Sequence, residues 1–289
     1  MSRVNRAIEL LEQGQPIYYT GVEEVSYAGG VAAAQTWADY LIVEMEHGAF
    51  NPTALADFMR GLVAGGPTRS GHRTPAVVVT LPTDGADEQT LRANAWMVKQ
   101  VLACGVHGIL LCHAETPGAV KVFVEAARYS FQALGVGNGL EQGRRGQGGQ
   151  VGAAAIWGLP VPDYLDRADV WPLNPNGELM LGLKIENKRA LANVEFSVSI
   201  PGIAFAEWGP GDMGMSFGYK DAHDPPYPPE LDAARSRIKA ACDSAHIAFL
   251  NSVSVDSVVA MIEEGVRVCA GNQAAAEIGR QLTKREMPW

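Results

Sequence analysis

Short apolar runs alternate with longer segments of helical periodicity along most of the chain. This alternation is typical of βαβ units and a parallel sheet. The apolar runs predict eight strands, at 16–20, 40–44, 76–80, 108–112, 179–185, 203–206, 247–250 and 266–269. The helical patterns include 53–63, 93–103, 117–127, 188–196, 229–244 and 255–264. Eight such units in 289 residues favour a single (β/α)8 (TIM) barrel over an open sheet, as one domain spanning 1–289 with a helix at each end.

One segment, 135–152, interrupts this pattern because it is rich in glycine and has no apolar periodicity. It is predicted to be a long loop. Two interpretations stay open: a flexible surface insertion, or a cover over the substrate site at one end of the barrel. In the second interpretation Arg144 and Arg145 would meet an anionic substrate.

Composition narrows the class of protein. The chain is 47% hydrophobic and 19% charged, with a formal net charge of -9 and scattered basic residues, so a nucleic-acid or anionic-membrane partner is not expected. The four cysteines form no CxxC pair and are predicted to be reduced, mostly buried thiols. No apolar run of 18 or more residues and no signal-peptide pattern is evident, so we expect a cytoplasmic protein without a membrane span.

Two carboxylates follow two neighbouring predicted strands. Glu186 closes the run 179–185, and Asp212 lies in a Gly-Pro-Gly-Asp segment shortly after 203–206. Alone, Glu186 could be a charge at a helix N-terminus and Asp212 a turn residue. Together they predict one shared divalent cation, because the carboxyl ends of barrel strands meet at the mouth where chemistry is done. Oxygen ligands favour Mg²⁺ or Mn²⁺, with Co²⁺ as a third candidate.

A histidine follows the second predicted strand. His47 has Glu44 and Glu46 close by in sequence, and a histidine beside a carboxylate is a candidate base near neutral pH. The alternative is a histidine hydrogen-bonded to backbone at the start of a loop. His113, just past the fourth strand, has the same placement but fewer acidic residues close by in sequence.

These residues resemble the HpcH/HpaI aldolases, class II metal-dependent pyruvate aldolases. The resemblance covers about 3–275 and rests on Glu-His-Gly at 46–48, the segment 98–105, Lys-Ile-Glu at 184–186 and Gly-Pro-Gly-Asp at 209–212. It implies a (β/α)8 barrel in which Glu186 and Asp212 hold the metal and His47 is catalytic. It also implies that the amides of Gly211 and Asp212 bind the carboxylate of a 2-oxo acid, and that a C-terminal helix, 273–283, packs on a neighbour in a homo-oligomer, from dimer to hexamer.

The sequence departs from the family pattern at several positions. Thr80 stands where the family has a strand-three arginine that meets substrate oxygens, and Lys184 stands where it usually has glutamine. Asn94 replaces a usual aspartate, and Glu44 stands for the aspartate expected near His47. We hypothesise that Lys184 replaces the lost arginine charge; the alternatives are a lysine pointing outward, or a Schiff-base lysine.

The sequence therefore predicts a metal-dependent aldehyde-lyase that cleaves or forms 4-hydroxy-2-oxo acids through a pyruvate-type enolate. His47, Glu44 and Lys184 are the expected catalytic residues, and Thr80 and Arg145 join Gly211, Asp212 and Lys184 as expected substrate contacts. The partners would be a 2-oxo acid and an aldehyde. The alternatives are a related lyase or decarboxylase acting on another 2-oxo or β-keto acid, including the acyl-CoA lyase type, and a non-catalytic barrel that binds metal and oxo acid.

Overall fold

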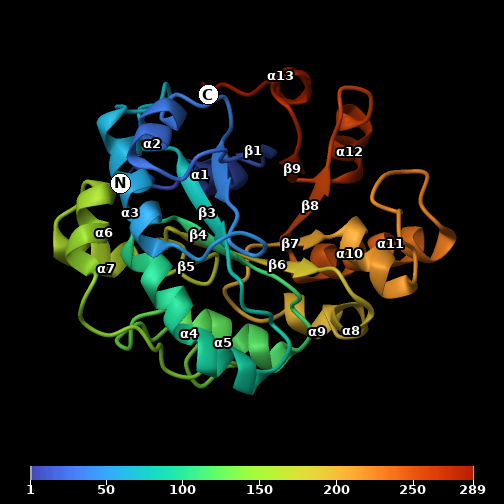
Figure 1. Ribbon diagram of the computed structural model, residues 1–289, viewed down its shortest axis with the longest axis horizontal. Coiled ribbons are helices and arrows are strands. Elements are labelled where there is room, and N and C mark those ends of the chain that lie inside the picture. Colours follow the sequence, from blue (N-terminus) through green and yellow to red (C-terminus); the bar gives the residue numbers. More distant parts are fainter. Residues whose placement is uncertain (1, 289) are drawn as a thin grey trace.

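Eight parallel strands close into a barrel in the structure, a computed structural model that describes residues 2–288 (Figure 1). The strands are β1 (Ile17–Gly21), β2 (Tyr40–Val43), β3 (Ala76–Thr80), β4 (Gly108–Leu111), β6 (Leu179–Ile185), β7 (Phe205–Trp208), β8 (Ala248–Ser252) and β9 (Val268–Ala270). Each pairs with its neighbours in chain order, and the ring closes through β4 with β6 and β1 with β9. The predicted TIM barrel is confirmed. A two-residue strand that was not predicted, β5 (Val170–Trp171), pairs with the start of β6.

Helices surround the barrel and mostly follow the predicted segments. They are α1 (Arg6–Glu12), α2 (Tyr27–Ala33), α3 (Pro52–Ala64), α4 (Glu88–Ala103), α5 (Pro117–Ala127), α6 (Gln150–Trp157), α7 (Val161–Arg167), α8 (Lys188–Ala192), α9 (Val194–Val198), α10 (Pro210–Phe217), α11 (Pro229–Ala245), α12 (Val258–Glu264) and α13 (Gln273–Leu282). The predicted helix 188–196 is divided into α8 and α9, and α2, α6, α7 and α10 were not predicted.

Because of the pleat of β6, its side chains alternate between the apolar layer under the helices and the barrel interior. Leu181 and Leu183 belong to the apolar layer between barrel and helices, whereas Met180 faces the barrel interior. Since side chains alternate along a strand, Lys184 and Glu186 share the interior face with Met180. The lower interior is apolar and is closed by α1, whose Ile8 packs in the same cluster. On this interior face, the polar side chains Lys184 and Glu186 therefore lie at the carboxyl end of β6.

The glycine-rich segment is not a cover over the mouth. It is tied to α5, where Arg144 N donates to Glu125 O at 2.8 Å, and α6 begins inside it. The Arg145 guanidinium is 4.1 Å from the centre of the Tyr129 ring and donates to the Tyr164 hydroxyl at 3.0 Å. These contacts bury Arg145, at 5% exposure, near the carboxyl end of α5, which is the end opposite the mouth. The expectation that Arg145 contacts substrate is therefore corrected.

The C-terminal helix α13 packs on its own barrel. Gly279 lies against Tyr18 so closely that a side chain there would overlap the hydroxyl, and Arg280 donates to Trp37 O at 2.7 Å. Packing of α13 on a neighbouring chain stays a prediction. All four cysteines are free thiols, as predicted. Within residues 2–288, no helix combines the length and apolar character needed to cross a membrane.

Candidate active site

The two carboxylates predicted to share a cation line one cleft of about 410 Å³ at the mouth. Glu186 follows β6, its side chain is only 2% exposed, and its Oε1 accepts from His113 N at 2.8 Å. Asp212 lies in the first turn of α10. The connection between β7 and α10 passes so near Glu186 that a Cβ atom on Gly209 would lie 2.8 Å from Glu186 Oε2. The absent side chain at Gly209 thus lets the N-terminus of α10 approach the carboxylate.

Lys184 faces the barrel interior beside Glu186, so the interpretation of an outward lysine is wrong. Its Nζ lies 2.5 Å from Glu46 Oε2 and 3.9 Å from Glu186 Oε2. Burial would lower the pKa of Lys184, but the acidic groups around it outweigh burial and raise that pKa above its ordinary value. Burial likewise would raise the pKa of Glu46, and the hydrogen bond from Lys184 instead lowers it. Lys184 is therefore a charged ammonium, which does not support the Schiff-base alternative.

The carboxylate beside the His47 ring is Glu46, and the expectation that it is Glu44 is corrected. His47 is exposed, and its Nε2 lies 3.8 Å from Glu46 Oε2. Glu44 instead accepts from the backbone N–H of His47 at 3.1 Å, so it shapes the turn after β2. The physical reason is that the turn brings the backbone of residues 46 and 47 back onto the Glu44 carboxylate.

Thr80 is a support for that turn and not a substrate contact, which corrects another expectation. Its hydroxyl donates to Glu44 Oε1 at 2.9 Å and accepts from Met45 N at 2.9 Å. The side chain is buried, at 1% exposure. Thr80 therefore holds the turn that presents Glu46 and His47. Asn94, the other departure, bonds to Thr90 O within α4.

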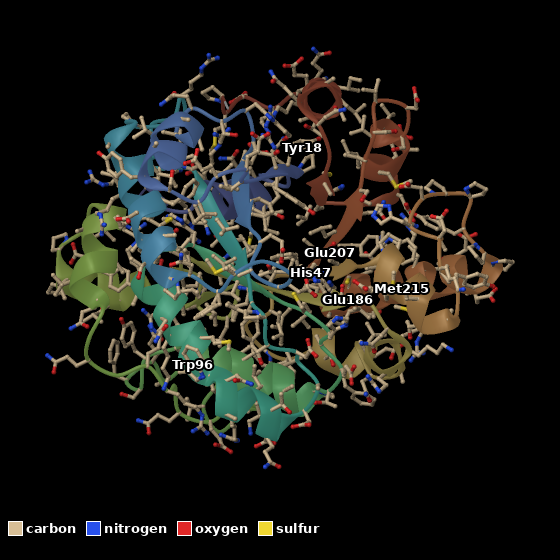
Figure 2. All side chains as sticks on the ribbon, in the orientation of Figure 1. Tyr18, His47, Trp96, Glu186, Glu207 and Met215 are labelled. Atoms are coloured by element: carbon tan, nitrogen blue, oxygen red, sulfur yellow. The ribbon has the colours of Figure 1, made fainter. Side chains whose placement is uncertain are left out.

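Two residues of the site were missed or undervalued from sequence. His113 lies between two carboxylates, with Nε2 3.7 Å from Glu46 Oε1 and Nδ1 3.6 Å from Glu186 Oε1. Glu207 pairs in register with Lys184 and shares the interior face of β7 with Phe205. Burial raises the pKa of Glu207 to about 7. The strand predicted at 203–206 ended too early, so the alternation that reveals Glu207 was not followed. Glu207 and Glu186 are near enough for their charges to interact, and both are labelled in Figure 2.

The residues present fit a divalent cation. Glu46 and Glu186 offer carboxylate oxygens within 4.8 Å of each other, in a group that also contains a ring nitrogen of His113. Glu46 Oε1 is buried without a hydrogen-bond partner in the described part of the chain, and burial raises the pKa of Glu186 against the opposing charge of Lys184. The single positive charge of Lys184 therefore does not balance the negative charges of Glu46 and Glu186. Carboxylate oxygens suit hard cations such as Mg²⁺ or Mn²⁺, which could supply the missing positive charge.

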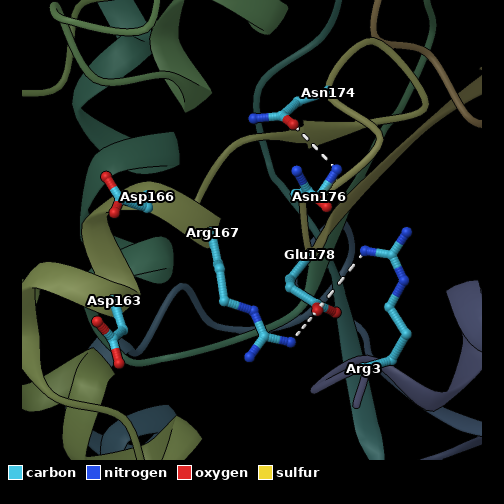
Figure 3. Close-up of a pocket in the computed structure, with 7 residues that line it drawn as sticks. All are labelled: Arg3, Asp163, Asp166, Arg167, Asn174, Asn176 and Glu178. Carbon is cyan, nitrogen blue, oxygen red and sulfur yellow. Dashed lines mark hydrogen bonds and ion pairs between the residues drawn. The ribbon is translucent and has the colours of Figure 1, made fainter. Parts of the chain in front are cut away.

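A second polar depression, of about 530 Å³, lies at the opposite end of the barrel (Figure 3). Arg3 and Arg167 flank the fully buried Glu178, which precedes β6 and also accepts from Asn5 N at 2.8 Å. The charges there pair with one another and tie the N-terminal segment to α7. This depression is a structural junction, and the chemistry belongs to the mouth.

Comparisons with known proteins identify the family of the chain. The family described as HpcH/HpaI aldolase/citrate lyase matches residues 31–275. A 2-keto-3-deoxy-L-rhamnonate aldolase of Klebsiella pneumoniae is 29% identical over 221 residues, which cover 76% of this chain and 69% of that protein. A solved HpcH/HpaI aldolase/citrate lyase family protein from Burkholderia cenocepacia matches with a TM-score of 0.72 at 23% identity, covering 97% of this chain and 98% of that one. A HpcH/HpaI aldolase from Desulfitobacterium hafniense matches with a TM-score of 0.66 at 17% identity, over 97% of each chain.

The family match runs from α2 into α13 and so includes every strand of the barrel except β1. The resemblance found in the sequence is thereby confirmed, and the chain belongs to the HpcH/HpaI aldolase/citrate lyase family.

Proposed function

We propose that this protein is a divalent-metal-dependent carbon–carbon lyase that cleaves or forms 4-hydroxy-2-oxo acids. The observation that carries the proposal is the buried Glu186 carboxylate, which shares one cleft with Asp212 and lies beside the Lys184–Glu46 ion pair. The aldolase names of relatives such as the one from Klebsiella support the reaction class. Their 2-keto-3-deoxy sugar acid supports a substrate with a 2-oxo group and a hydroxyl at C4.

Glu186 and Asp212 would hold the cation, Mg²⁺ or Mn²⁺. When bound, such an ion polarises the 2-oxo group and stabilises an enolate. The amides of Gly211 and Asp212 are in the first turn of α10, where N–H groups have no acceptor within the helix. They would bind the substrate carboxylate, since a helix N-terminus favours anions.

Glu46 and His47 are the pair we propose for proton transfer. In cleavage the C4 hydroxyl loses its proton to this pair, the C3–C4 bond breaks, and its electrons pass into the enolate. A proton returned to C3 then completes pyruvate, so the count of protons balances. The exposed His47 ring connects Glu46 to solvent, since its Nε2 is 3.8 Å from Glu46 Oε2.

Lys184 would supply the positive charge that the family places on strand three. Its ammonium is held by Glu46 beside the cleft, 3.9 Å from Glu186, so it can stabilise an oxyanion that forms next to Glu186. The acyl-CoA alternative has no comparable support. The basic pair at 144–145 is engaged with Glu125 and Tyr164 away from the mouth. A cytoplasmic homo-oligomer, from dimer to hexamer, remains our proposal for the working form.

The test is deuterium exchange of the pyruvate methyl group, followed by NMR in D₂O with Mg²⁺ or Mn²⁺ and then with EDTA. We expect metal-dependent exchange that EDTA abolishes. Glu186→Gln should slow it by about 100-fold or more, since the buried ligand loses its charge. Asp224→Asn, an exposed carboxylate near the mouth, is the matched control and should leave it unchanged. Binding of pyruvate without exchange or cleavage would instead support the non-catalytic alternative.

A further inference from the structure

His113 is oriented by Asn187, the residue that caps α8. Asn187 Oδ1 accepts from the backbone N–H groups of Arg189 at 3.0 Å and Ala190 at 2.9 Å, so the amide oxygen is committed to the helix. Its Nδ2 therefore faces away from the helix, where it donates to Glu115 Oε1 at 3.0 Å and lies 3.2 Å from His113 Nδ1. Four contacts fix the orientation of this amide.

The fixed amide determines the tautomer of His113. An amide nitrogen carries only hydrogen atoms, so His113 Nδ1 accepts and the ring proton is on Nε2. The backbone of His113 is also fixed, in the left-handed region at φ 45°, by its N–H donation to Glu186. With one ring nitrogen occupied and the other protonated, the imidazole has no free lone pair for a cation. Its closeness to Glu46 and Glu186 therefore does not make it a metal ligand.

The N–H group at His113 Nε2 lies near a hydrogen-bond acceptor that lacks a donor, Glu46 Oε1. Among residues 2–288, Glu46 Oε1 has no hydrogen-bond donor; this oxygen is buried, and the Glu46 side chain is 6% exposed. Nε2 lies 3.7 Å from this oxygen, which is too long for a hydrogen bond. A donor and an acceptor side by side match a hydroxyl group, which accepts one hydrogen bond and donates another. A hydroxyl about 2.8 Å from each would satisfy both.

We propose that His113 Nε2 and Glu46 Oε1 bind the C4 hydroxyl of the substrate, an inference that rests on the proposed function. The hydroxyl donates to Glu46, which is where its proton leaves, and accepts from His113. When the C3–C4 bond breaks, the hydroxyl oxygen becomes the aldehyde oxygen. It remains an acceptor, so the hydrogen bond from His113 persists through cleavage. His113 is thus a substrate-binding residue at the aldehyde end of the cleft.

The first test compares two reactions of the metal-loaded protein, only one of which involves a C4 hydroxyl. These are cleavage of 4-hydroxy-2-oxopentanoate and deuterium exchange of pyruvate. His113→Asn suits the left-handed backbone but is too short to reach the hydroxyl. It should lower kcat/KM for cleavage by about 30-fold while exchange changes less than about 3-fold. His113→Gln, which keeps a donor at similar reach, should retain most cleavage activity. His246→Asn is the control, because His246 is exposed and has a similar left-handed backbone at φ 56°.

The second test reads the tautomer directly, from ¹⁵N-labelled histidine side chains in the metal-free protein. We expect His113 with its proton on Nε2. Asn187→Ser keeps a capping oxygen but removes the amide donor, so it should give a mixture of tautomers. Added Zn²⁺ should leave the His113 signals unchanged. Coordination of Zn²⁺ by His113, a proton on Nδ1 in the wild type, or equal losses of cleavage and exchange in His113→Asn would each overturn the proposal.

The two proposals fail in different ways. Wild-type protein that shows neither exchange nor cleavage would remove the proposed function, and the substrate role of His113 with it. Exchange and cleavage that both survive in His113→Asn would remove only the role of His113.

Discussion

At the scale of the residue, Thr80 shows how a buried hydroxyl can support a catalytic turn. Thr80→Val keeps the shape but leaves Met45 N and Glu44 without their partner. We expect a loss of about 1–3 kcal/mol in the free energy of unfolding, measured by urea denaturation. Thr83→Val is the matched control, because the Thr83 hydroxyl is buried and has no partner among the described residues. Equal losses in both variants would contradict this account of Thr80.

Glu207 gives a pH dependence whose sign follows from burial. Burial raises its pKa to about 7 from an ordinary value of 4.5, so between these values the folded protein holds a proton that the unfolded chain has lost. The contribution of Glu207 to stability therefore falls as pH rises through this window, by about 1.4 kcal/mol for each pH unit at most.

Glu207→Gln cannot lose a proton and should remove this slope. Unfolding free energies measured in EDTA at several pH values should show the variant gaining on the wild type from about pH 5 to pH 7. Parallel curves for the two proteins would show that Glu207 titrates normally.

At the scale of the element, a glycine in β6 leaves space for an aromatic ring of the neighbouring strand β7. A Cβ atom on Gly182 would lie 2.2 Å from the ring of Phe205, which faces the barrel interior from β7. Gly182→Ala should cost about 1–3 kcal/mol through overpacking, measured by thermal or urea unfolding. Adding Phe205→Leu should recover part of that loss. Gly21→Ala, on β1 with no atom within 4 Å of the added group, is the control, and an equal cost there would point to strand propensity instead.

Elements with strong periodicity could be predicted, and irregular ones could not. The β6 strand and α5 have the predicted bounds, because both are apolar and each is followed by a polar residue. By contrast, α6 begins among glycines and has no side-chain cap. Helix α10 begins at Pro210, in a Gly-Pro-Gly-Asp segment whose sequence is equally typical of a turn. Their sequences carry weak local signals, and packing against the barrel decides their structure.

At the scale of the whole molecule, one carboxylate joins the two ends of the chain. Asp39 Oδ1 lies 3.1 Å from Arg6 Nη2, 3.3 Å from Arg280 Nη2 and 2.7 Å from Arg285 Nη1. Burial lowers the pKa of Arg6 to about 10, which still leaves it charged at neutral pH. The N-terminal helix and the segment after α13 are thus held at the amino end of the barrel by a shared buried charge.

Asp39→Asn should therefore release the C-terminal segment as well as lower stability. Loss of the carboxylate that pairs with these three arginines should cost about 3–5 kcal/mol, because unpaired buried charges are strongly destabilising. Urea denaturation gives the energy, and limited proteolysis should show earlier cleavage after α13. Asp57→Asn, which removes a largely exposed pair with Arg60, should cost less than about 1 kcal/mol. A similar small cost for Asp39→Asn would mean that the arginines do not depend on it.

The sequence by itself determined the barrel, the family and the carboxylates Glu186 and Asp212, because these depend on periodicity and on residues placed just after strands. Only the tertiary structure decided that Glu46, not Glu44, lies beside His47, that Thr80 supports the turn, and that Arg145 is buried far from the mouth. The same is true of Glu207 and of the tautomer of His113. The physical reason is that hydrogen bonds and burial join residues far apart in the chain, and local patterns carry no record of those partners.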